Sequence, residues 1–395
     1  MKVGLYGIQG VYNFGCEAII RGAFNFIKDI YPDSEVIYFS FSASFDEKVF
    51  ENLDLKIVSL TRKYLFHKKV INKILKTINS TKRIAMFDMD SIIDSVDMFV
   101  SIGGDIYTIP QILRNKNKYP YYNPLVDFCD RAIKKGKKVI VYGASVGPWG
   151  NYKKAVNYNV NALRKYKAIL CREEETIGYL HSLGLKNAFF FPDPAFQVRS
   201  GEVGEKKYIG INLSPLSLKE LYGSYGDIYV KKLADLIDRL YEVTRIDLLF
   251  IPHVLSSDES DNDLLFMKKI QDIMVHKENV VFADSSNGFV GLKKYIAQCY
   301  VVVAARMHCA VNAIDENIPA IFLAYSQKSI GMCKYVYKSD NYLIDLKNIE
   351  CELIDKVVDT VKNSNELSSN LMMRNKEIKQ YYESNIGMIR KLIEK

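Results

Sequence analysis

The sequence predicts an α/β protein built of two doubly wound, Rossmann-like domains that face a cleft. Short apolar, β-branched runs alternate with amphipathic stretches along the chain, a pattern typical of parallel sheets covered by helices on both faces. The runs at residues 139–142 and 300–303 are apolar throughout, so both faces of these strands are expected to be buried. A polar, glycine-bearing stretch at residues 192–207 then divides the chain into two halves.

The expected elements follow in order. Strands are predicted at residues 3–6, 35–39, 98–102, 138–142, 168–171 and 188–191, and then at 208–212, 247–251, 280–282, 300–304, 320–323 and 342–344. Helical periodicity is clearest at 18–28, 229–244, 308–317 and 367–395. We therefore expect a first domain over 1–200 and a second over 205–366, with a helix at 367–395 that can pack back on the first domain. Ligands of such sheets bind at the carboxyl ends of the strands.

Composition favours a folded protein with anionic partners. Of the 395 residues, 48% are hydrophobic and 25% are charged, and the formal net charge is +8. No apolar run of about 18 residues is present, and the N-terminus lacks the core of a signal peptide, so a cytoplasmic location is expected. The cysteines and histidines are not spaced as metal ligands, so no metal site is expected. No nucleic-acid-binding motif is visible.

One segment, residues 56–83, holds nine Lys or Arg and no Asp or Glu. Within it, Ile71, Ile74, Leu75 and Ile78 share one face of a predicted helix, and lysines occupy the other. Such a basic amphipathic helix can contact an anionic membrane surface, or it can pack on its domain with a solvated lysine face. The pattern leaves both interpretations open.

Three glycine-rich loops follow strands of the first half. Glycines let backbone N–H groups approach a ligand, and a helix N-terminus favours anions, although each loop can equally be a structural turn. The residues of these loops that can contact a ligand are Asn13, Gly15, Glu17, Gly103, Asp105 and Ser145, and Asp105 could accept hydrogen bonds from sugar hydroxyls. Ser145 also lies in a G-x-S-x-G motif, the nucleophile elbow of serine hydrolases, but Gly147 and Pro148 crowd the turn where a helix would have to begin.

Cationic residues at strand ends are candidates for anion binding. Arg306 and His308 follow an apolar strand and precede a helix, and in an extended backbone their side chains point the same way. An Arg beside a His can bind a dianion and transfer a proton. His253 and Lys328 follow other strands of this half, and Arg172 ends a strand of the first half. Arg172 can hold an anion or pair with a nearby Glu.

Several short motifs stand in a characteristic order along the chain. They are the segments 13–18, 103–104, 143–148, 172–176, 180–184, 192–196, 306–308 and 319–328. In this order they resemble the bacterial polysaccharide pyruvyl transferases over nearly the whole length. The departures are Cys16 and Glu173, where the family often has Asp, and Asp105, where a third Gly is frequent.

The resemblance implies a glycosyltransferase-B-like fold and transfer of pyruvate from phosphoenolpyruvate to a sugar as a cyclic ketal, with release of phosphate. It implies no metal or organic cofactor, a donor site in the second domain and a saccharide acceptor on the first. By position, Arg306 and His308 look like the donor-site pair, with Arg172 as a further candidate. We assign His308 as the general acid, and we add Lys328 and His253 to the donor site from their places after strands.

The acceptor is expected to be a precursor of a surface polysaccharide, a capsule or a cell wall. An acceptor linked to polyprenyl would give segment 56–83 a function at the inner face of the plasma membrane. Three alternatives stay open: a nucleotide-sugar-dependent glycosyltransferase of the same architecture, a serine hydrolase acting through Ser145, and a non-catalytic sugar- or lipid-binding protein.

Overall fold

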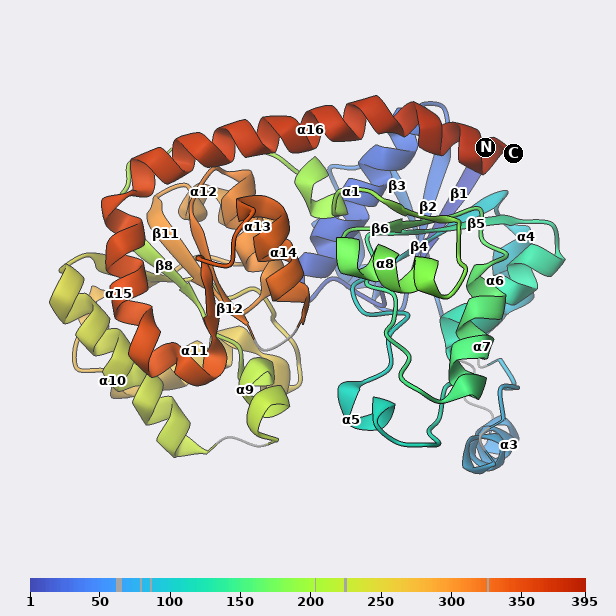
Figure 1. Ribbon diagram of the computed structural model, residues 1–395, viewed down its shortest axis with the longest axis horizontal. Coiled ribbons are helices and arrows are strands. Elements are labelled where there is room, and N and C mark those ends of the chain that lie inside the picture. Colours follow the sequence, from blue (N-terminus) through green and yellow to red (C-terminus); the bar gives the residue numbers. More distant parts are fainter. Residues whose placement is uncertain (62–65, 79, 86, 203, 224–225, 325–326) are drawn as a thin grey trace. The chain divides into compact units, whose positions relative to one another are not determined.

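The computed structural model describes residues 1–61, 66–78, 80–85, 87–202, 204–223, 226–324 and 327–395, and the side chains of residues 66, 327 and 328 lie outside this description. The chain forms two units. Unit 1 comprises Met1–Val11, Ile19–Pro194 and Tyr382–Lys395, and unit 2 comprises Tyr12–Ala18 and Ala195–Tyr381. Each unit contains a parallel sheet with helices packed against it (Figure 1).

The sheet of unit 1 has seven parallel strands in the order β3-β2-β1-β4-β5-β6-β7. The strands are β1 (Lys2–Tyr6), β2 (Glu35–Ser40), β3 (Leu55–Ser59), β4 (Met98–Ile102), β5 (Lys138–Tyr142), β6 (Ala168–Cys171) and β7 (Ala188–Phe190). The helices are α1 (Phe14–Ile30), of which the part up to Ala18 belongs to unit 2, α2 (Ala43–Val49), α3 (Phe66–Thr77), α4 (Met89–Asp94), α5 (Gln111–Arg114), α6 (Pro124–Lys134), α7 (Lys153–Leu163) and α8 (Glu174–Ser182). The strand order reverses between β1 and β4, which is where doubly wound sheets bind ligands.

The sheet of unit 2 has six parallel strands in the order β10-β9-β8-β11-β12-β13. The strands are β8 (Tyr208–Asn212), β9 (Asp247–Phe250), β10 (Val280–Phe282), β11 (Cys299–Ala304), β12 (Ala320–Ala324) and β13 (Leu343–Asp345). The helices are α9 (Pro215–Tyr222), α10 (Asp227–Thr244), α11 (Asp263–Ile273), α12 (Gly288–Ile296), α13 (Met307–Asp315), α14 (Gln327–Tyr337), α15 (Ile349–Lys362) and α16 (Ser364–Glu394), with short 3₁₀ turns at Pro194–Gln197, Glu259–Asp261, Lys277–Asn279 and Leu346–Asn348. Here the order reverses between β8 and β11.

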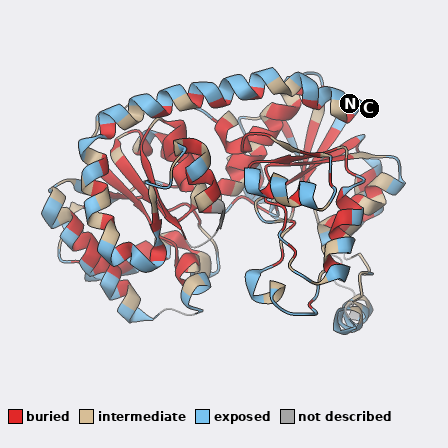
Figure 2. Ribbon diagram, viewed as in Figure 1, coloured by how far each residue is buried: buried red, intermediate tan, exposed pale blue. Residues whose placement is uncertain are grey.

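The buried strands explain why the sequence reads as continuous apolar runs. In β11, Val301 and Val303 pack in one core cluster, whereas Val302 and Ala304 pack in another. Alternate residues of a strand point to opposite faces, so both faces of this sheet are covered. Figure 2 shows buried residues concentrated in the sheets and on the inner faces of the helices. The predicted α/β class with two doubly wound, Rossmann-like sheets is confirmed.

The boundary between the units differs from the predicted one. Residues 12–18 were expected in the first domain but belong to unit 2, and unit 2 resumes at Ala195 rather than near residue 205. The physical reason is packing, since Phe14 and Phe196 are buried in a core cluster of the second sheet. The polar stretch is also held: Arg199 Nε donates to Asp315 Oδ1 over 3.1 Å.

The C-terminal helix α16 contributes to both units, with its last part, from Tyr382 onward, in unit 1. There the Tyr382 hydroxyl donates to Asp29 Oδ2 over 2.7 Å, and Lys138 Nζ donates to the carbonyl oxygen of Glu394 over 3.0 Å. Within the described parts of the chain, no helix has the length and apolar content needed to span a membrane.

Candidate functional site

Arg306 lies where β11 ends and α13 begins. Its backbone is extended, with φ −89° and ψ 119°, and it stands in the N-cap position of α13. The backbone N–H of Arg306 donates to Oδ1 of Asn212, the last residue of β8, over 2.8 Å. Since β8 and β11 are the strands between which the order reverses, the site lies at the switch point of unit 2.

Two aspartates fix the guanidinium of Arg306. Its Nε and Nη2 donate to Asp263 Oδ1 over 3.1 and 2.8 Å, and Nη2 also donates to Asp261 Oδ1 over 2.6 Å. The Asp263 side chain is fully buried, whereas that of Asp261 is 26% exposed. Burial raises the pKa of Asp263, and the positive charge of Arg306 opposes that shift. We call Arg306, Asp261, Asp263 and Asn212 the Arg306 cluster.

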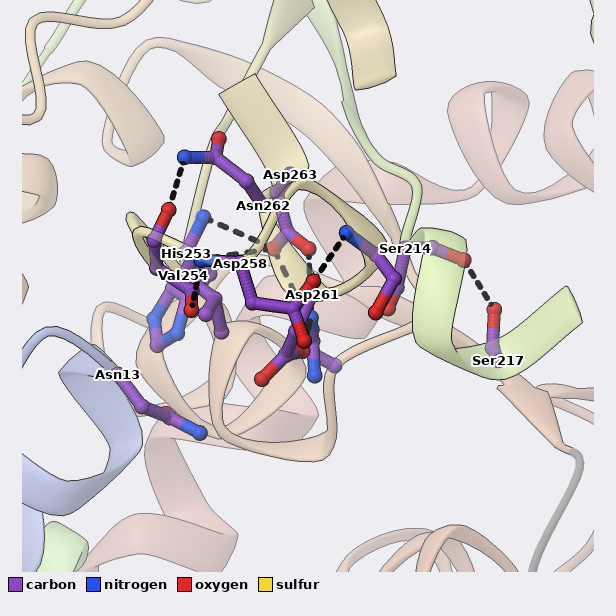
Figure 3. A network of polar contacts seen from close by, with 12 residues as sticks. Asn13, Ser214, Ser217, His253, Val254, Asp258, Asp261, Asn262 and Asp263 are labelled. Carbon is purple, nitrogen blue, oxygen red and sulfur yellow. Dashed lines mark hydrogen bonds and ion pairs between the residues drawn. The ribbon is translucent and has the colours of Figure 1, made fainter. Parts of the chain in front are cut away.

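Asp263 also organises the backbone around His253. Its Oδ2 accepts hydrogen bonds from the backbone N–H groups of His253 and Val254 over 3.2 and 3.1 Å. It further accepts from Asn212 Nδ2 over 3.1 Å. Figure 3 shows the Asp261 and Asp263 side chains beside His253. One buried carboxylate thereby holds both the guanidinium and the loop that follows β9.

The imidazole of His253 is fully buried. It packs between the rings of Phe14 and Phe289, with centroid distances of 5.7 and 5.8 Å. Among the described residues, neither ring nitrogen has a hydrogen-bond partner. Burial, and then the nearby His308 and Arg306, hold the pKa of His253 well below its ordinary value. His253 is therefore neutral near pH 7.

His308 lies in the first turn of α13 and is half-buried. Gly15 packs directly on its ring, because a Cβ atom at Gly15 would lie 2.5 Å from His308 Nδ1. The segment 12–18 therefore lines the site in unit 2, and our placement of Asn13, Gly15 and Glu17 on the first domain is corrected. Asn13 Oδ1 accepts from the Gly15 backbone N–H over 2.9 Å. The buried Glu17 accepts from the backbone N–H of Phe289 over 2.7 Å, a helix-capping contact.

Sequence reasoning missed several groups of this site. Asp261 and Asp263 lie in an acidic stretch that reads as a solvated turn, and only the fold brings them to Arg306. Burial raises the pKa of Glu220 in α9 and of Tyr12, and Arg306 acts electrostatically on both. Only their positions after strands could have indicated them. Glu220 follows β8, the two aspartates follow β9, and Tyr12 follows β1. The side chain of Lys328 lies outside the described residues.

Arg172 is enclosed in unit 1 by carboxylates. Its side chain is 1% exposed, and Nη1 contacts Asp193 Oδ2 over 2.8 Å while Nε lies 3.4 Å from Glu173 Oε1. Nη2 donates to Ser145 Oγ over 3.2 Å. The structure therefore does not bring Arg172 together with Arg306 in one unit. Its buried charge is offset by two acids, which is the pairing that the sequence left open.

Ser145 does not stand in a nucleophile elbow. It follows β5, but no helix begins after it, and α7 starts only at Lys153. Its hydroxyl donates to Glu173 Oε1 over 2.7 Å. A strand, a tight turn at the serine and an immediate helix define the elbow, so the local geometry argues against the serine-hydrolase alternative.

Two adjoining cavities lie at the carboxyl end of the sheet in unit 1. The polar cavity, about 360 Å³, is lined by residues that include Gln9, Thr108, Tyr121, Tyr122, Asn123 and Asn159. The apolar cavity, about 300 Å³, is lined by residues that include Phe39, Phe41, Leu60, Phe87, Met89 and Phe128. Gly7 lines both. Its φ is +119°, and a Cβ there would lie 2.3 Å from the Ile102 carbonyl oxygen, so only glycine fits.

The loop residues predicted for the acceptor lie beside these cavities in the chain but do not line them. Asp105 is exposed, and its carbonyl accepts from the Thr108 hydroxyl over 3.1 Å. Gly103 has a φ of +147°, and the Ser145 backbone N–H donates to the Gly104 carbonyl over 2.8 Å. For the described part of the chain, no group of three or more His, Cys, Asp or Glu is placed to hold a metal ion.

Two parallel-sheet units, each with ligand-suited groups at its switch point, define the class of glycosyltransferase-B-like proteins. Within this class the chain belongs to the polysaccharide pyruvyl transferase family, whose model matches residues 13–327. It is thus an enzyme of the type that transfers pyruvyl groups to polysaccharide, and the predicted family is confirmed. No curated protein sequence matches the chain.

Solved structures share the fold at low identity. A Listeria monocytogenes protein described as a UDP-N-acetylglucosamine 2-epimerase has a TM-score of 0.57 at 11% identity, covering 94% of this chain and 89% of its own. The Neisseria meningitidis UDP-GlcNAc 2-epimerase bound to UDP-GlcNAc has 0.55 at 10%, covering 94% of each chain. Anabaena HepE in complex with UDP has 0.51 at 11%, covering 97% of this chain and 100% of its own.

Proposed function

We propose that this enzyme transfers pyruvate from phosphoenolpyruvate to a saccharide as a cyclic ketal, with the donor bound at the Arg306 cluster. The observation that carries the proposal is an arginine that two aspartates fix at the amino end of α13, two residues before His308, in a chain of this family. Phosphoenolpyruvate presents a carboxylate and a phosphate, and both suit a guanidinium and the N–H groups of a first helical turn.

Asp261 is the contact that an incoming anion can displace. It is partly exposed and lies in a single 3₁₀ turn, whereas Asp263 is buried and holds Arg306 through two guanidinium nitrogens. We therefore assign Asp263 to positioning and Asp261 to a contact that yields to the donor. The ion pair with Asp263 would keep the guanidinium plane fixed in both states.

The chemistry requires an acid and a base. Protonation of the methylene carbon makes C2 of phosphoenolpyruvate electrophilic, and a sugar hydroxyl attacks there and loses its proton. The C2–O bond to phosphate then breaks, a second sugar hydroxyl attacks C2 to close the ketal, and its proton passes to the departing phosphate. His308 is our candidate for the acid, because a histidine can hold or release a proton near neutral pH. The neutral, buried His253 adds no positive charge to the site.

The saccharide is assigned to the polar cavity of unit 1. Its walls offer amide, hydroxyl and aromatic groups, which suit the hydroxyls and apolar faces of a sugar ring. The acceptor class we propose is a precursor of a surface polysaccharide or cell wall. No cofactor other than the donor substrate is part of this proposal.

We also propose that the enzyme works in the cytoplasm at an anionic membrane surface, through segment 56–83. The described part of this segment includes the lysine-rich helix α3, where Val70, Ile71 and Ile74 are exposed, and Ile78 just after its end is exposed as well. A solvated lysine face alone does not require exposed isoleucines, and their combination is typical of an interfacial helix.

A ligand-dependent stability measurement tests the donor assignment. At about 100 times its dissociation constant, a ligand adds about 2.7 kcal/mol to the folded state. We expect phosphoenolpyruvate to raise the midpoint of thermal unfolding by a few degrees in the wild type. Arg306→Lys keeps the charge but not the planar fork, so the shift should be lost. The matched control is Arg245→Lys, in the turn between α10 and β9, and this variant should keep the shift of the midpoint.

The alternative glycosyltransferase predicts a different result. A shift caused by uridine diphosphate, with none from phosphoenolpyruvate, would replace the proposed function. Release of phosphate from phosphoenolpyruvate only when a saccharide is present would be the positive result in an activity assay. Release without any saccharide would contradict the transfer.

A further inference from the structure

The apolar cavity of unit 1 is not needed for the transfer of pyruvate to a free sugar. Its volume of about 300 Å³ is at the lower end of the range for small-molecule sites, about 300–1,000 Å³. It opens where β1, β2 and β3 end, and α4 and α6 supply its remaining walls. It is therefore a feature of the ligand-binding edge of the sheet and not a packing defect in the core.

The walls of this cavity suit hydrocarbon. Phe39, Phe41 and Phe87 present aromatic rings, and Leu60 and Met89 present aliphatic side chains. Tyr6 also lines it, but its hydroxyl is engaged with the Cys129 thiol in the core. A sugar hydroxyl buried here would lose its hydrogen bonds to water, whereas a methylene group would gain from leaving water.

The polar and apolar cavities share a wall. Gly7, Gln9, Pro124 and Leu125 line both. A ligand with a polar head and an apolar chain could therefore place the head in the polar cavity and the start of the chain in the neighbouring apolar cavity. Two unrelated ligands would not need a common wall.

Positive charge and exposed apolar side chains stand next to these cavities. The chain runs from the wall residue Leu60 through α3 to the wall residue Phe87. The Asn72 side chain in α3 holds the segment that follows this helix, because its Nδ2 donates to the Ile84 carbonyl over 2.9 Å and its Oδ1 accepts from the Ile84 backbone N–H over 2.8 Å. The guanidinium of Arg83 then lies 4.6 Å from the ring centroid of Tyr122, which lines the polar cavity. This charge suits an anionic amphiphile at a bilayer surface.

We propose that unit 1 binds a membrane-anchored glycolipid, with the saccharide in the polar cavity and the first part of its apolar chain in the apolar cavity. The identity of the saccharide as pyruvyl acceptor rests on the proposed function, but the binding of the chain does not. α3 lies at the bilayer surface from which the chain enters.

Affinity as a function of chain length tests the proposal. The full-length protein is titrated with butyl, hexyl and octyl glycosides of one sugar, below micelle formation. Each added methylene should strengthen binding about fourfold until the cavity is filled. Leu60→Trp fills the cavity from a half-buried position and should abolish this dependence, with the butyl glycoside still bound. Val243→Trp, at an exposed position of α10, should behave as the wild type.

A second variant guards against a folding defect. Phe87→Ala enlarges the cavity, so the gain in affinity should extend to longer chains than in the wild type. Equal affinity for all chain lengths in the wild type would overturn the proposal, as would an unchanged dependence in Leu60→Trp. Chain-dependent binding without phosphate release from phosphoenolpyruvate would support this inference and overturn the proposed function. Transfer to a free sugar as efficient as transfer to its octyl glycoside would overturn this inference alone.

Discussion

Arg306 and Asp263 depend on each other. Asp263 is a fully buried carboxylate, and the guanidinium of Arg306 donates to it from two nitrogens. A buried pair of this kind contributes little relative to an apolar pair of the same shape, but removing one partner leaves an uncompensated charge. The same contact that positions the arginine for the donor therefore makes it important for stability.

We predict that Arg306→Ala lowers the free energy of unfolding by about 3–5 kcal/mol, because Asp263 loses its cation. The double variant Arg306→Leu with Asp263→Asn should recover more than half of that loss, since the buried charge is then gone. Urea unfolding measures both. A loss of less than about 1 kcal/mol in Arg306→Ala would show that Asp263 does not need the arginine.

His253 is expected to make the free energy of unfolding depend on pH. Its pKa in the folded protein lies well below the ordinary value of about 6.5, so below that pH the unfolded chain binds a proton that the folded chain does not. Stability should therefore fall as the pH drops below about 6.5, by up to about 1.4 kcal/mol per pH unit from this group.

His253→Leu removes that contribution. Between about pH 6.5 and about pH 5.5 its urea midpoint should fall less than that of the wild type. The matched control is His67→Leu, at an exposed position of α3, which should retain the wild-type dependence. An identical pH dependence in His253→Leu would contradict a neutral, buried His253.

At the scale of elements, α3 carries apolar side chains that are exposed. Ile74 in α3 is 58% exposed, and Ile78, just after the end of this helix, is 67% exposed. We predict that the full-length protein co-sediments with vesicles containing anionic lipid and that the bound fraction decreases with added salt. Ile74→Asp should reduce binding severalfold, because it places a charge in the apolar face.

The control for α3 is Ile228→Asp in α10, an exposed position of similar side chain that should leave vesicle binding unchanged. Two outcomes would contradict the role of α3. One is a wild type that does not bind anionic vesicles at all. The other is an Ile74→Asp variant that binds as well as the wild type.

The elements that sequence reasoning missed have a common cause. β3 was not predicted, because its residues lie at an edge of the sheet and only partly alternate between buried and exposed positions. The stretch after Pro194 reads as a linker, yet Ser200 and Glu202 donate hydrogen bonds to Glu316. Neither β3 nor the contacts of residues 200–202 can be predicted from the local sequence, because both depend on partners far away in the chain.

At the scale of the molecule, each unit is expected to respond to its own ligand. In hydrogen-exchange measurements, phosphoenolpyruvate should slow exchange in residues 253–263 and 305–309 of unit 2. A saccharide should slow exchange in residues 105–110 and 120–125 of unit 1, which border the polar cavity. The reason is that a bound ligand raises the free energy of local opening where it contacts the chain.

The control for this mapping is β13, the edge strand of the unit 2 sheet, which is separated from β11 by β12 and should not respond to either ligand. Protection by phosphoenolpyruvate confined to unit 1 would contradict the proposed division between donor and acceptor. Protection of both regions by uridine diphosphate alone would favour the glycosyltransferase instead.

The sequence by itself determined the fold class and the family. Apolar runs separated by amphipathic stretches require parallel sheets covered on both faces, and that requirement is local to each run. The motifs around Arg306 and His308 likewise stand in the chain where a strand meets a helix, so their place at a strand end could be predicted. The enzyme class followed from the order of such motifs.

Only the tertiary structure decided which partners these residues have. Asp263 meets Arg306, Gly15 meets His308 and Glu173 meets Ser145 because parallel strands bring the ends of distant segments to one edge of a sheet. The two cavities of unit 1 arise in the same way from loops that follow separate strands. Strand order is set by the packing of whole elements, and no short pattern of residues encodes it.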